Sequence, residues 1–305
     1  MARPARNPLI PTRDGVSPSC VSLPVGPWAT VLDFLAERLP TVSRADWANR
    51  MAQGLVLDEQ GHAVPNDHPY RHSQRLHYYR NRPQEPDLPV QVQVVFEDAH
   101  LLVADKPHFM PVTPSGPYVQ QSLLVQLKRL TGCEDLSPIH RIDRETAGLV
   151  LLSKRPQDRD AYQALFRDKT IRKVYQAVAA HSPDLQWPLV RTSRMVEDSQ
   201  HFFKMCEVPG EPNSETRIHL LRHEGQQALY QLEPITGKRH QLRVHMNALG
   251  LPIEGDQFYP QVLRGPDEAE DFKHPLQLLA QAVDFTDPLT GERRCFESRL
   301  QLSFN

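Results

Sequence analysis

The stretch Pro138 to Leu152, PIHRIDRETAGLVLL, is where the fold and the site of this chain can first be inferred. Five charged or titratable side chains fall within six positions, His140 to Glu145, and the apolar run Gly148 to Leu152 follows at once. A short apolar run of this kind predicts a buried strand. Charges grouped at the mouth of a buried strand predict a functional site there.

The composition is that of a soluble globular protein, with 39% hydrophobic and 24% charged residues among 305. No apolar run is long enough to span a membrane. The basic N-terminus lacks the apolar core of a secretory signal, so we expect a cytoplasmic protein without membrane contact. Four cysteines are scattered singly, which predicts reduced thiols and no metal site.

The net charge of -2 gives no global signature of a nucleic-acid-binding protein. Two windows, His68 to Gln84 and Pro234 to Ile253, are nevertheless basic and contain no acidic residue. Local basic surfaces of this kind are what phosphate contacts need. Their cations are Arg71, Arg75, Arg80 and Arg82 in the first window, and Lys238, Arg239 and Arg243 in the second.

The first part of the chain predicts a tail followed by a small domain. Residues 1–25 are rich in Pro, Arg and Ser, which predicts a flexible N-terminal tail. Helical spacing of apolar residues predicts a helix over 29–39 and a second over 44–53, with Ser43 as the N-cap of the second. Alternation around a Gln-Gly turn predicts a hairpin after Gly54.

This order, with SRADWANRMAQGLVLDEQGHAV, resembles the S4-type RNA-binding domain, which is named after a ribosomal protein. The resemblance implies an S4-like RNA-binding domain over residues 26–83, with Arg71 and Arg75 as RNA contacts. Asp58, Glu59 and His62 replace the lysines and asparagine usual around the hairpin. The alternative is a structural subdomain that touches no RNA.

Residues 84–305 predict a second, larger domain in which strands outnumber helices. Strands that rarely alternate with helices favour an α+β fold with a mixed, mainly antiparallel central sheet and flanking helices. Two strands are expected in VQVVFEDAHLLVADKP, residues 92–107, with a turn near Asp98. Further strands are expected at 148–152, 172–180, 187–208, 218–232 continuing into EPITGKRHQLRVHM, and the final ESRLQLSF. Helices are expected at 122–130 and 157–166.

Asp143 lies between Arg141 and Arg144, and spacing alone leaves two interpretations of it. An acid flanked by arginines before a core strand is usually a structural ion pair. The same arrangement can keep a carboxylate ionised for use as a nucleophile or base. Taken alone, the pattern favours the ion pair.

The motif HRIDRETAGLVLLSK resembles the segment around the catalytic aspartate of RluA-type RNA pseudouridine synthases. Four further segments resemble motifs of that family in the same order: EDAHLLVADKP, RKVYQAVA, TGKRHQLRVHMNALGLPIEGDQFY and DFTDPLTGE. The departures are small: Ile142 replaces Leu, Ala147 replaces Ser, Lys238 stands where Arg is commoner, and Asp287 where His often precedes the Pro. The resemblance implies the pseudouridine synthase fold for residues 84–305.

The resemblance also implies roles for the site residues. Asp143 would be the catalytic aspartate, attacking either the ribose anomeric carbon or the uracil ring. Tyr175 would pack against the base and help remove the proton from carbon 5, and Arg243 would pair with the catalytic carboxylate. Arg141 would fill the space of the flipped base or hold the backbone beside it; as a structural residue it would pair with Asp143. Lys106, Lys238 and His240 are expected as RNA contacts or supporting groups.

The expected function is isomerisation of specific uridines in RNA to pseudouridine, without a cofactor, because the reaction involves no net redox change or group transfer. Ribosomal RNA is the favoured substrate and transfer RNA the other, and a monomer is the default. The alternative is a non-catalytic RNA-binding or ribosome-assembly factor on the same fold. Hydrolysis of nucleosides would need no RNA surface, so the two basic windows disfavour it.

Overall fold

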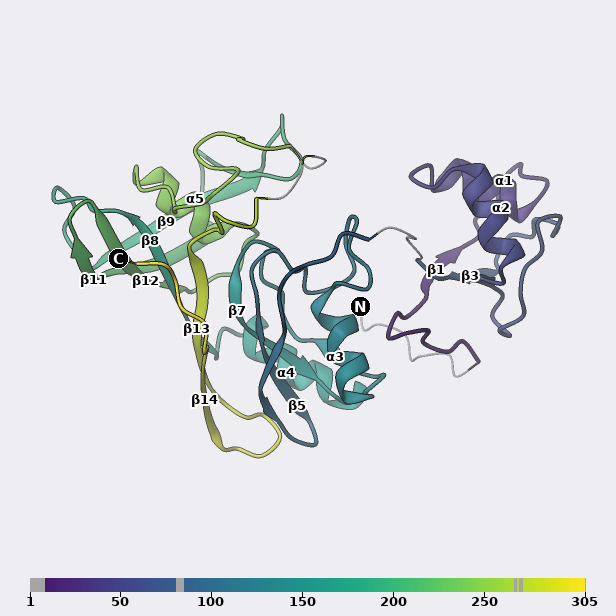
Figure 1. Cartoon of the computed structure of the whole chain (residues 1–305), viewed down its shortest axis with the longest axis horizontal. Coiled ribbons are helices and arrows are strands. Elements are labelled where there is room, and N and C mark those ends of the chain that lie inside the picture. The colour runs from purple at the N-terminus through teal and green to yellow at the C-terminus, as the bar shows by residue number, and fades with distance from the viewer. Residues whose placement is uncertain (1–8, 81–84, 266–267, 269–270, 305) are drawn as a thin grey trace.

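The structure is a computed structural model that describes residues 9–80, 85–265, 268 and 271–304. It contains a small N-terminal unit and a larger domain built on one eleven-stranded sheet (Figure 1). The expected domain boundary at 83/84, and Arg82, lie outside the described residues. In the described part of the chain, no helix has the length and apolar character needed to cross a membrane.

The N-terminal unit packs two helices against a three-stranded sheet of order β1-β3-β2. Both predicted helices are confirmed, and the Ser43 hydroxyl accepts a hydrogen bond from the Asp46 N–H, as expected of an N-cap. Leu57 and Ala63 pair across the predicted hairpin. The elements are α1 (Val31–Arg38), α2 (Arg44–Ala52), β1 (Ser19–Ser22), β2 (Val56–Leu57) and β3 (Arg75–Tyr78).

The prediction of a flexible tail is wrong for residues 9–25. Strand β1 lies in this segment and pairs with β3 along its length. Val16 is buried against Val125 of the larger domain, and the Lys128 ammonium donates a hydrogen bond to the Ser17 hydroxyl at 3.0 Å. Isolated apolar residues among prolines give no periodic signal, so only these tertiary contacts order the segment.

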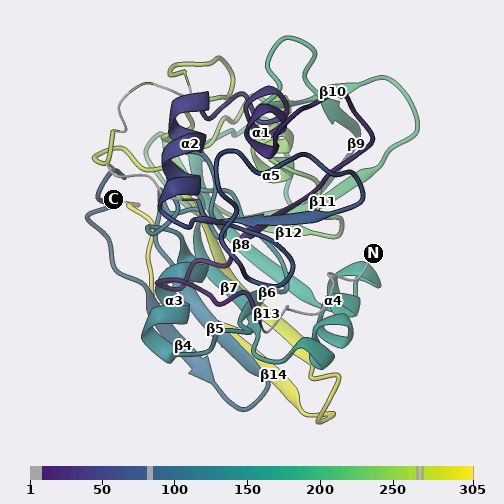
Figure 2. The same ribbon diagram turned by 90° about the vertical axis from the view of Figure 1, so that its right-hand side faces the viewer.

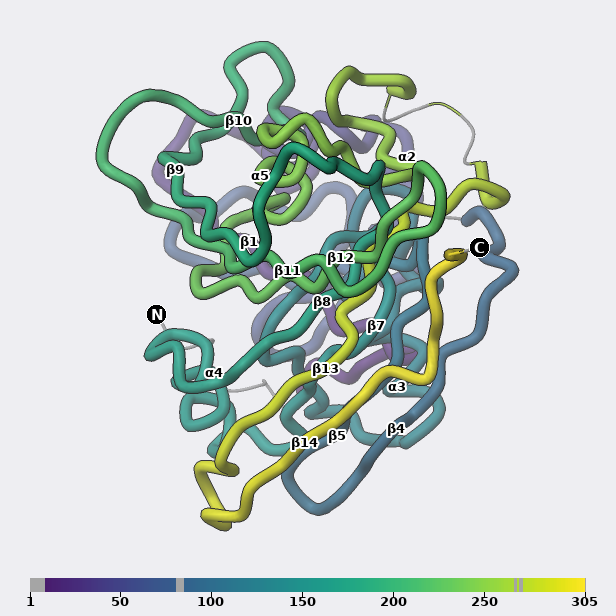
Figure 3. The backbone as a smooth tube through the Cα atoms, turned by 90° about the vertical axis from the view of Figure 1, so that its left-hand side faces the viewer, coloured from purple at the N-terminus to yellow at the C-terminus, as the bar shows by residue number. Residues whose placement is uncertain are grey.

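The large sheet has the order β10-β9-β11-β12-β8-β13-β7-β5-β4, with β14 on β13 and β6 on β7. Its pairings are antiparallel except for β7 with β13, so the sheet is mixed. Figure 3 shows the C-terminal β13–β14 hairpin beside β8. The strands are β4 (Gln93–Glu97), β5 (Leu101–Lys106), β6 (Ser137–Pro138), β7 (Ala147–Ser153), β8 (Arg172–Ala180), β9 (Leu189–Glu197), β10 (Met205–Val208), β11 (Ser214–Glu224), β12 (Gln227–Pro234), β13 (Leu278–Thr286) and β14 (Arg293–Glu297).

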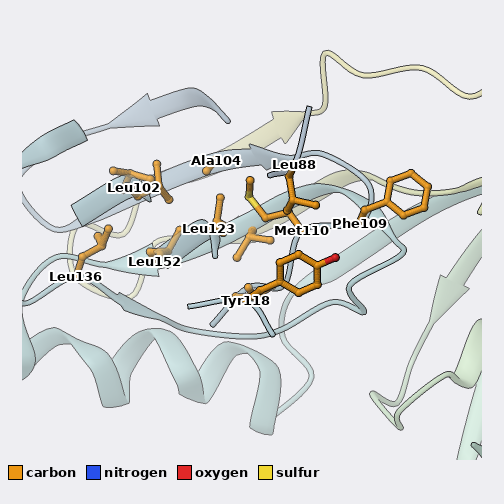
Figure 4. Packing of buried hydrophobic residues seen from close by; sticks show 12 residues of the cluster. Leu88, Leu102, Ala104, Phe109, Met110, Tyr118, Leu123, Leu136 and Leu152 are labelled. Carbon is orange, nitrogen blue, oxygen red and sulfur yellow. The ribbon is translucent and has the colours of Figure 1, made fainter. Parts of the chain in front are cut away.

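Helices α3 (Leu123–Thr131) and α4 (Arg159–Arg167) cover opposite faces of the half of the sheet that contains β5 and β7 (Figure 2). A short 3-10 turn, η1 (Pro156–Asp158), precedes α4. Successive side chains of β5 point to opposite faces, so Leu102 faces the α3 side and Leu101 the α4 side. Figure 4 shows the core on the α3 side. The predicted buried strand after the charged motif is confirmed as β7, which is buried throughout.

Helix α5 (Gln241–Ala248) replaces the strand expected in TGKRHQLRVHM. The Gln241 amide organises the turn before it: its oxygen accepts from the Thr236 hydroxyl and the Lys238 N–H, and its nitrogen donates to the Glu215 carbonyl and Thr216 hydroxyl. The first six residues of α5 are all buried, although polar and apolar side chains alternate along QLRVHM. Such alternation is the pattern of a strand, so the sequence showed no helical period.

The final predicted strand, ESRLQLSF, is wrong beyond its first residue. Strand β14 ends at Glu297, and no strand is present over residues 298–304. The buried Asp105 carboxylate accepts hydrogen bonds from the Ser298 hydroxyl and the Arg299 N–H. These two bonds direct the chain away from the sheet edge, although its sequence still alternates.

Gly148→Ala should destabilise the protein strongly. Gly148 has φ +109, and a Cβ there would lie 2.4 Å from the Ala280 carbonyl oxygen where β7 meets β13. We expect a loss of about 2–4 kcal/mol in the free energy of unfolding, measured by urea denaturation. Gly132→Ala is the matched control, because φ is +67 there but nothing lies within 4 Å of its Cβ. Equal losses in the two variants would contradict the close approach.

Candidate active site

A cleft of about 830 Å³ opens where the charged motif, the start of β8 and the start of α5 come together. Six cationic side chains line it, and Asp143 is the one carboxylate among its lining residues. A cleft with this balance suits a polyanionic ligand better than a neutral one. The cations are Arg141, Arg167, Lys169, Lys173, Lys238 and Arg243.

The charged motif is held in place by His140. Its Nε2 accepts a hydrogen bond from the Leu151 N–H at 3.1 Å, and its ring stacks on Phe166 with the centroids 4.5 Å apart. Burial, with the charge of Lys173, lowers the pKa of His140 to about 3. His140 is therefore a neutral group that holds the charged motif against β7.

Lys106, at the end of β5, also supports the charged motif. Its ammonium donates hydrogen bonds to the Pro107 and Arg144 carbonyls at 2.9 and 3.0 Å. The residue is 0% exposed, and burial lowers its pKa to about 7. A side chain without exposed surface does not fit the RNA contact expected of Lys106, whereas it does fit the supporting role.

Arg243 is the electrostatic centre of the cleft floor. Its Nε and Nη2 donate to the two carboxylate oxygens of Asp256 at 2.8 and 2.6 Å. Its Nη1 lies 3.6 Å from Asp143 Oδ2 and has no hydrogen-bond partner among the described residues. The residue is 1% exposed and lies on α5, so its charge is enclosed by the protein.

The guanidinium of Arg243 also faces a third carboxylate, that of Glu145. Its Nη1 lies 3.7 Å from Glu145 Oε2, and Glu145 pairs with Arg144 at 2.9 Å. Burial alone would raise the pKa of Glu145, but the charges of Arg243 and Arg144 outweigh burial and lower it to about 2. Within the described chain, Arg243 thus lies within ion-pair distance of Asp143, whereas Arg141 does not make the local ion pair that spacing suggested.

Tyr175 lines the cleft from β8. Burial raises the pKa of its phenol well above the ordinary range, and the nearby charge of Asp143 raises it further. At neutral pH the ring is therefore a neutral phenol that presents an apolar face and one donor. A phenol in this state is suited to packing against a planar ligand and is a weak base.

The remaining predicted residues divide into two groups. Arg141, Lys238 and His240 line the cleft, and His240 adopts φ +54 before α5 with its Nδ1 3.1 Å from the Tyr259 hydroxyl. Arg71 and Arg75 are exposed on the N-terminal unit and are not among the cleft residues. The structure therefore gathers the predicted catalytic residues but not all the predicted RNA contacts.

Sequence reasoning missed Asp256, Lys169 and Lys173. Asp256 lies thirteen positions after Arg243, a spacing with no local meaning, and only the fold brings the two side chains together. Lys173 could have been found, because a residue two positions before Tyr175 on a strand faces the same side. Lys169 lies in the turn between α4 and β8, where side-chain direction follows from tertiary structure alone.

His245 supports α5 from the side opposite the cleft floor. Its Nε2 lies 3.1 and 2.9 Å from the Ser193 and Ser214 hydroxyls, and its Nδ1 lies 2.9 Å from the Thr216 hydroxyl. The residue is 0% exposed, and burial lowers its pKa to about 4. His245 is therefore neutral, and in this form it holds α5, the helix that carries Arg243, in place.

The free energy of unfolding should fall as the pH falls below about 6.5. His140 and His245 then bind protons more readily in the unfolded chain than in the folded one. Their folded pKa values, about 3 and about 4, lie below the unfolded value, so the contribution is complete above pH 6.5 and is lost toward pH 4. We expect about 1 kcal/mol less stability per histidine at pH 5.5 than at pH 7.5.

Urea denaturation at the two pH values measures this loss, and His245→Gln is the informative variant. Gln keeps hydrogen-bonding groups near the two serines but does not titrate, so the variant should be less stable at pH 7.5 yet lose less on acidification. The exposed variant His62→Gln is the control. An identical acid loss in wild type and His245→Gln would contradict the assignment.

Comparisons with known proteins bear on this geometry. A family model described as RNA pseudouridylate synthase matches residues 100–248. An uncharacterized RNA pseudouridine synthase of Synechocystis is 30% identical over 239 residues, covering 75% of this chain and 79% of that protein. The dual-specificity RNA pseudouridine synthase RluA of Vibrio cholerae is 30% identical over 218 residues, covering 68% and 81%. A solved structure of human RNA pseudouridylate synthase domain containing 1 superposes with a TM-score of 0.57 at 22% identity, covering 70% of this chain and 85% of that one.

Proposed function

The chain belongs to the RluA family of RNA pseudouridine synthases, and from this premise we propose that Asp143 is the nucleophile with which it isomerises uridine. As a member of that family, it is an isomerase that acts on RNA. The observation that carries the assignment of Asp143 is the buried arginine beneath it. Two nitrogens of Arg243, Nε and Nη2, donate hydrogen bonds to Asp256. The third, Nη1, lies 3.6 Å from the carboxylate of Asp143.

This arrangement suits a carboxylate that must attack and later leave. The cation beside Asp143 stabilises the negative charge that returns to the carboxylate when it leaves. Asp256 fixes the guanidinium in a bidentate geometry, so little reorganisation is needed during the reaction. Asp143 itself is part-exposed, with a side-chain exposure of 23%, and lines the cleft where a flipped base would enter.

In the proposed reaction Asp143 attacks either the ribose anomeric carbon or the uracil ring. In both cases the glycosidic bond between the anomeric carbon and uracil N1 breaks. The uracil turns within the cleft, and its carbon 5 bonds to the anomeric carbon. If Asp143 is bonded to the anomeric carbon, it leaves as this bond forms; if it is bonded to the uracil ring, it leaves the ring afterwards. Carbon 5 loses its proton and N1 gains one, so the atoms and charges balance. The raised pKa of Tyr175 favours packing against the base as its role over removal of the carbon 5 proton by a phenolate.

RNA would reach the cleft along its basic rim. We assign Arg141, Lys238 and His240 to this contact, because all three line the cleft and Arg141 and Lys238 are exposed. Arg141 precedes Asp143 by two positions and can fill the space that the flipped base vacates. Within the described structure, none of these side chains forms an ion pair with a carboxylate, so none is neutralised before RNA binds.

We also propose that the N-terminal unit is S4-like and extends the RNA contact. Its exposed Arg71 and Arg75 support this assignment. Its hairpin turn does not, because Asp58 there accepts hydrogen bonds from the Gln60 and His62 N–H groups and adds negative charge. An S4-like unit favours ribosomal RNA as the substrate, with transfer RNA as the second choice.

The test is a transcriptome-wide pseudouridine map of cells lacking the gene, complemented with wild type or Asp143→Asn. We expect at least one uridine to lose its modification and to regain it with the wild type alone. That uridine identifies the RNA substrate directly. Rescue of a growth defect by both versions, with no change in the map, would instead support the non-catalytic RNA-binding factor.

A further inference from the structure

Two lysines at the start of β8 form a cationic feature that the catalytic residues do not account for. Lys169 and Lys173 line both the main cleft and a recess of about 50 Å³ beside it. Their basic neighbours are neutralised: Arg167 pairs with Asp160 and Asp168, and Arg172 pairs with Glu233. In the described part of the chain, no carboxylate lies within ion-pair distance of either lysine.

The surroundings of Lys173 leave its charge uncompensated. In the described structure its ammonium donates one hydrogen bond, to the carbonyl of Thr236 at 3.4 Å, a residue that lines the main cleft. The side chain is half-buried, and its pKa is lowered to about 8, first by burial and then by the charge of Lys169. Both lysines line the recess, and the carboxylate among its lining residues, Glu233, is paired with Arg172. An anion would therefore stabilise the two ammonium groups.

The register of β8 places this site relative to the base pocket. Residues two apart on a strand face the same side, so Lys173, two positions before Tyr175, lies beside it on the cleft wall. The two Cα atoms are about 7 Å apart. A uracil packed against Tyr175 remains joined through its ribose to the RNA backbone. The next inward-facing side chain is then in position for the adjoining phosphate.

We propose that Lys169 and Lys173 bind the RNA phosphodiester next to the target uridine. This inference rests on the proposed function, because it takes a base beside Tyr175 as its reference point. Lys169 is exposed and meets the phosphate at the mouth of the recess, whereas Lys173 meets it from the cleft wall. The pair holds the backbone on one side of the base while Arg141 occupies the other.

The experiment measures RNA affinity as a function of salt, in the full-length Asp143→Asn protein, which should bind without turnover. The probe is a fluorescent RNA stem–loop whose uridine the wild-type protein converts. Each lysine that contacts a phosphate of a single strand contributes about 0.7 to the slope of log affinity against log salt. Lys169→Gln and Lys173→Gln should each lower the slope by about that amount, and Lys173→Arg should preserve it.

Three controls separate this contact from other effects. The exposed variant Lys273→Gln, outside the cleft lining, should leave the slope unchanged. Lys169→Gln lies in an exposed turn, so it remains informative if Lys173→Gln fails to fold. A neutral methylphosphonate on one side of the converted uridine should reproduce the loss, and should add nothing further to Lys173→Gln.

Unchanged slopes in both Gln variants, or full additivity with a methylphosphonate on either side of the uridine, would overturn the proposal. The proposed function fails differently. In that case the wild-type protein would convert no uridine, whatever the salt dependence of binding.

Discussion

Replacing Asp143 by Asn should lower the rate of pseudouridine formation at least about a thousandfold, the scale of loss when a covalent nucleophile is removed. Affinity for RNA should stay within a few-fold, because Asp143 is the one acidic side chain in a cleft lined by six cations. The reaction can be followed by release of tritium from RNA labelled at carbon 5 of uridine, since that carbon loses its proton.

The matched control for this variant is Asp184→Asn, an exposed aspartate outside the cleft lining. It should convert RNA at the wild-type rate. Persistent tritium release by Asp143→Asn, in protein that binds RNA and unfolds at the wild-type urea midpoint, would remove Asp143 from the mechanism.

Arg243→Met should have the largest effect on stability together with a severe loss of activity. The substitution leaves the Asp256 carboxylate buried without its cation, although the Phe258 and Tyr259 N–H groups still donate to it. Breaking a buried ion pair on one side costs about 3–5 kcal/mol. Asp143 also loses the cation 3.6 Å away, so activity should fall by at least about a hundredfold.

The double variant Arg243→Met/Asp256→Asn separates the two effects. Asn removes the uncompensated charge and keeps an oxygen for the Phe258 and Tyr259 N–H groups, so a good part of the lost stability should return. Activity should not return, because the cation facing Asp143 is still missing. Urea denaturation and tritium release on the same preparations give both readouts. A double variant that regains activity with stability would show that Arg243 serves the fold alone.

The sequence by itself determined the buried strand β7, the helices of the N-terminal unit and the position of the charged motif. Each of these depends on a local pattern: a continuous apolar run, helical spacing, or a serine three positions before the N–H that it caps. Resemblance to a family added Tyr175 and Arg243, which local patterns alone would have given to the core and the surface. All the predicted catalytic residues line the one cleft of about 830 Å³.

Local patterns failed where the partner of a segment is distant in the chain. Residues 9–25 are ordered by β3 and α3, the segment after Glu297 by Asp105, and α5 by contacts on every side. In each case a tertiary contact outweighs the local preference. In α5 the alternation of QLRVHM imitates a strand, and the Pro-rich stretch that contains β1 gives no periodic signal.

The electrostatics of the site were likewise decided by tertiary structure alone. Spacing suggested that Asp143 pairs with its neighbouring arginines, but its cation comes from α5, held in place by Asp256. Lys106 and Lys173 differ in role although both are lysines on strands, because one is fully enclosed and the other opens into the cleft. Sequence gives the charges of these groups. Their burial and their partners, which set what each can do, depend on how the chain folds.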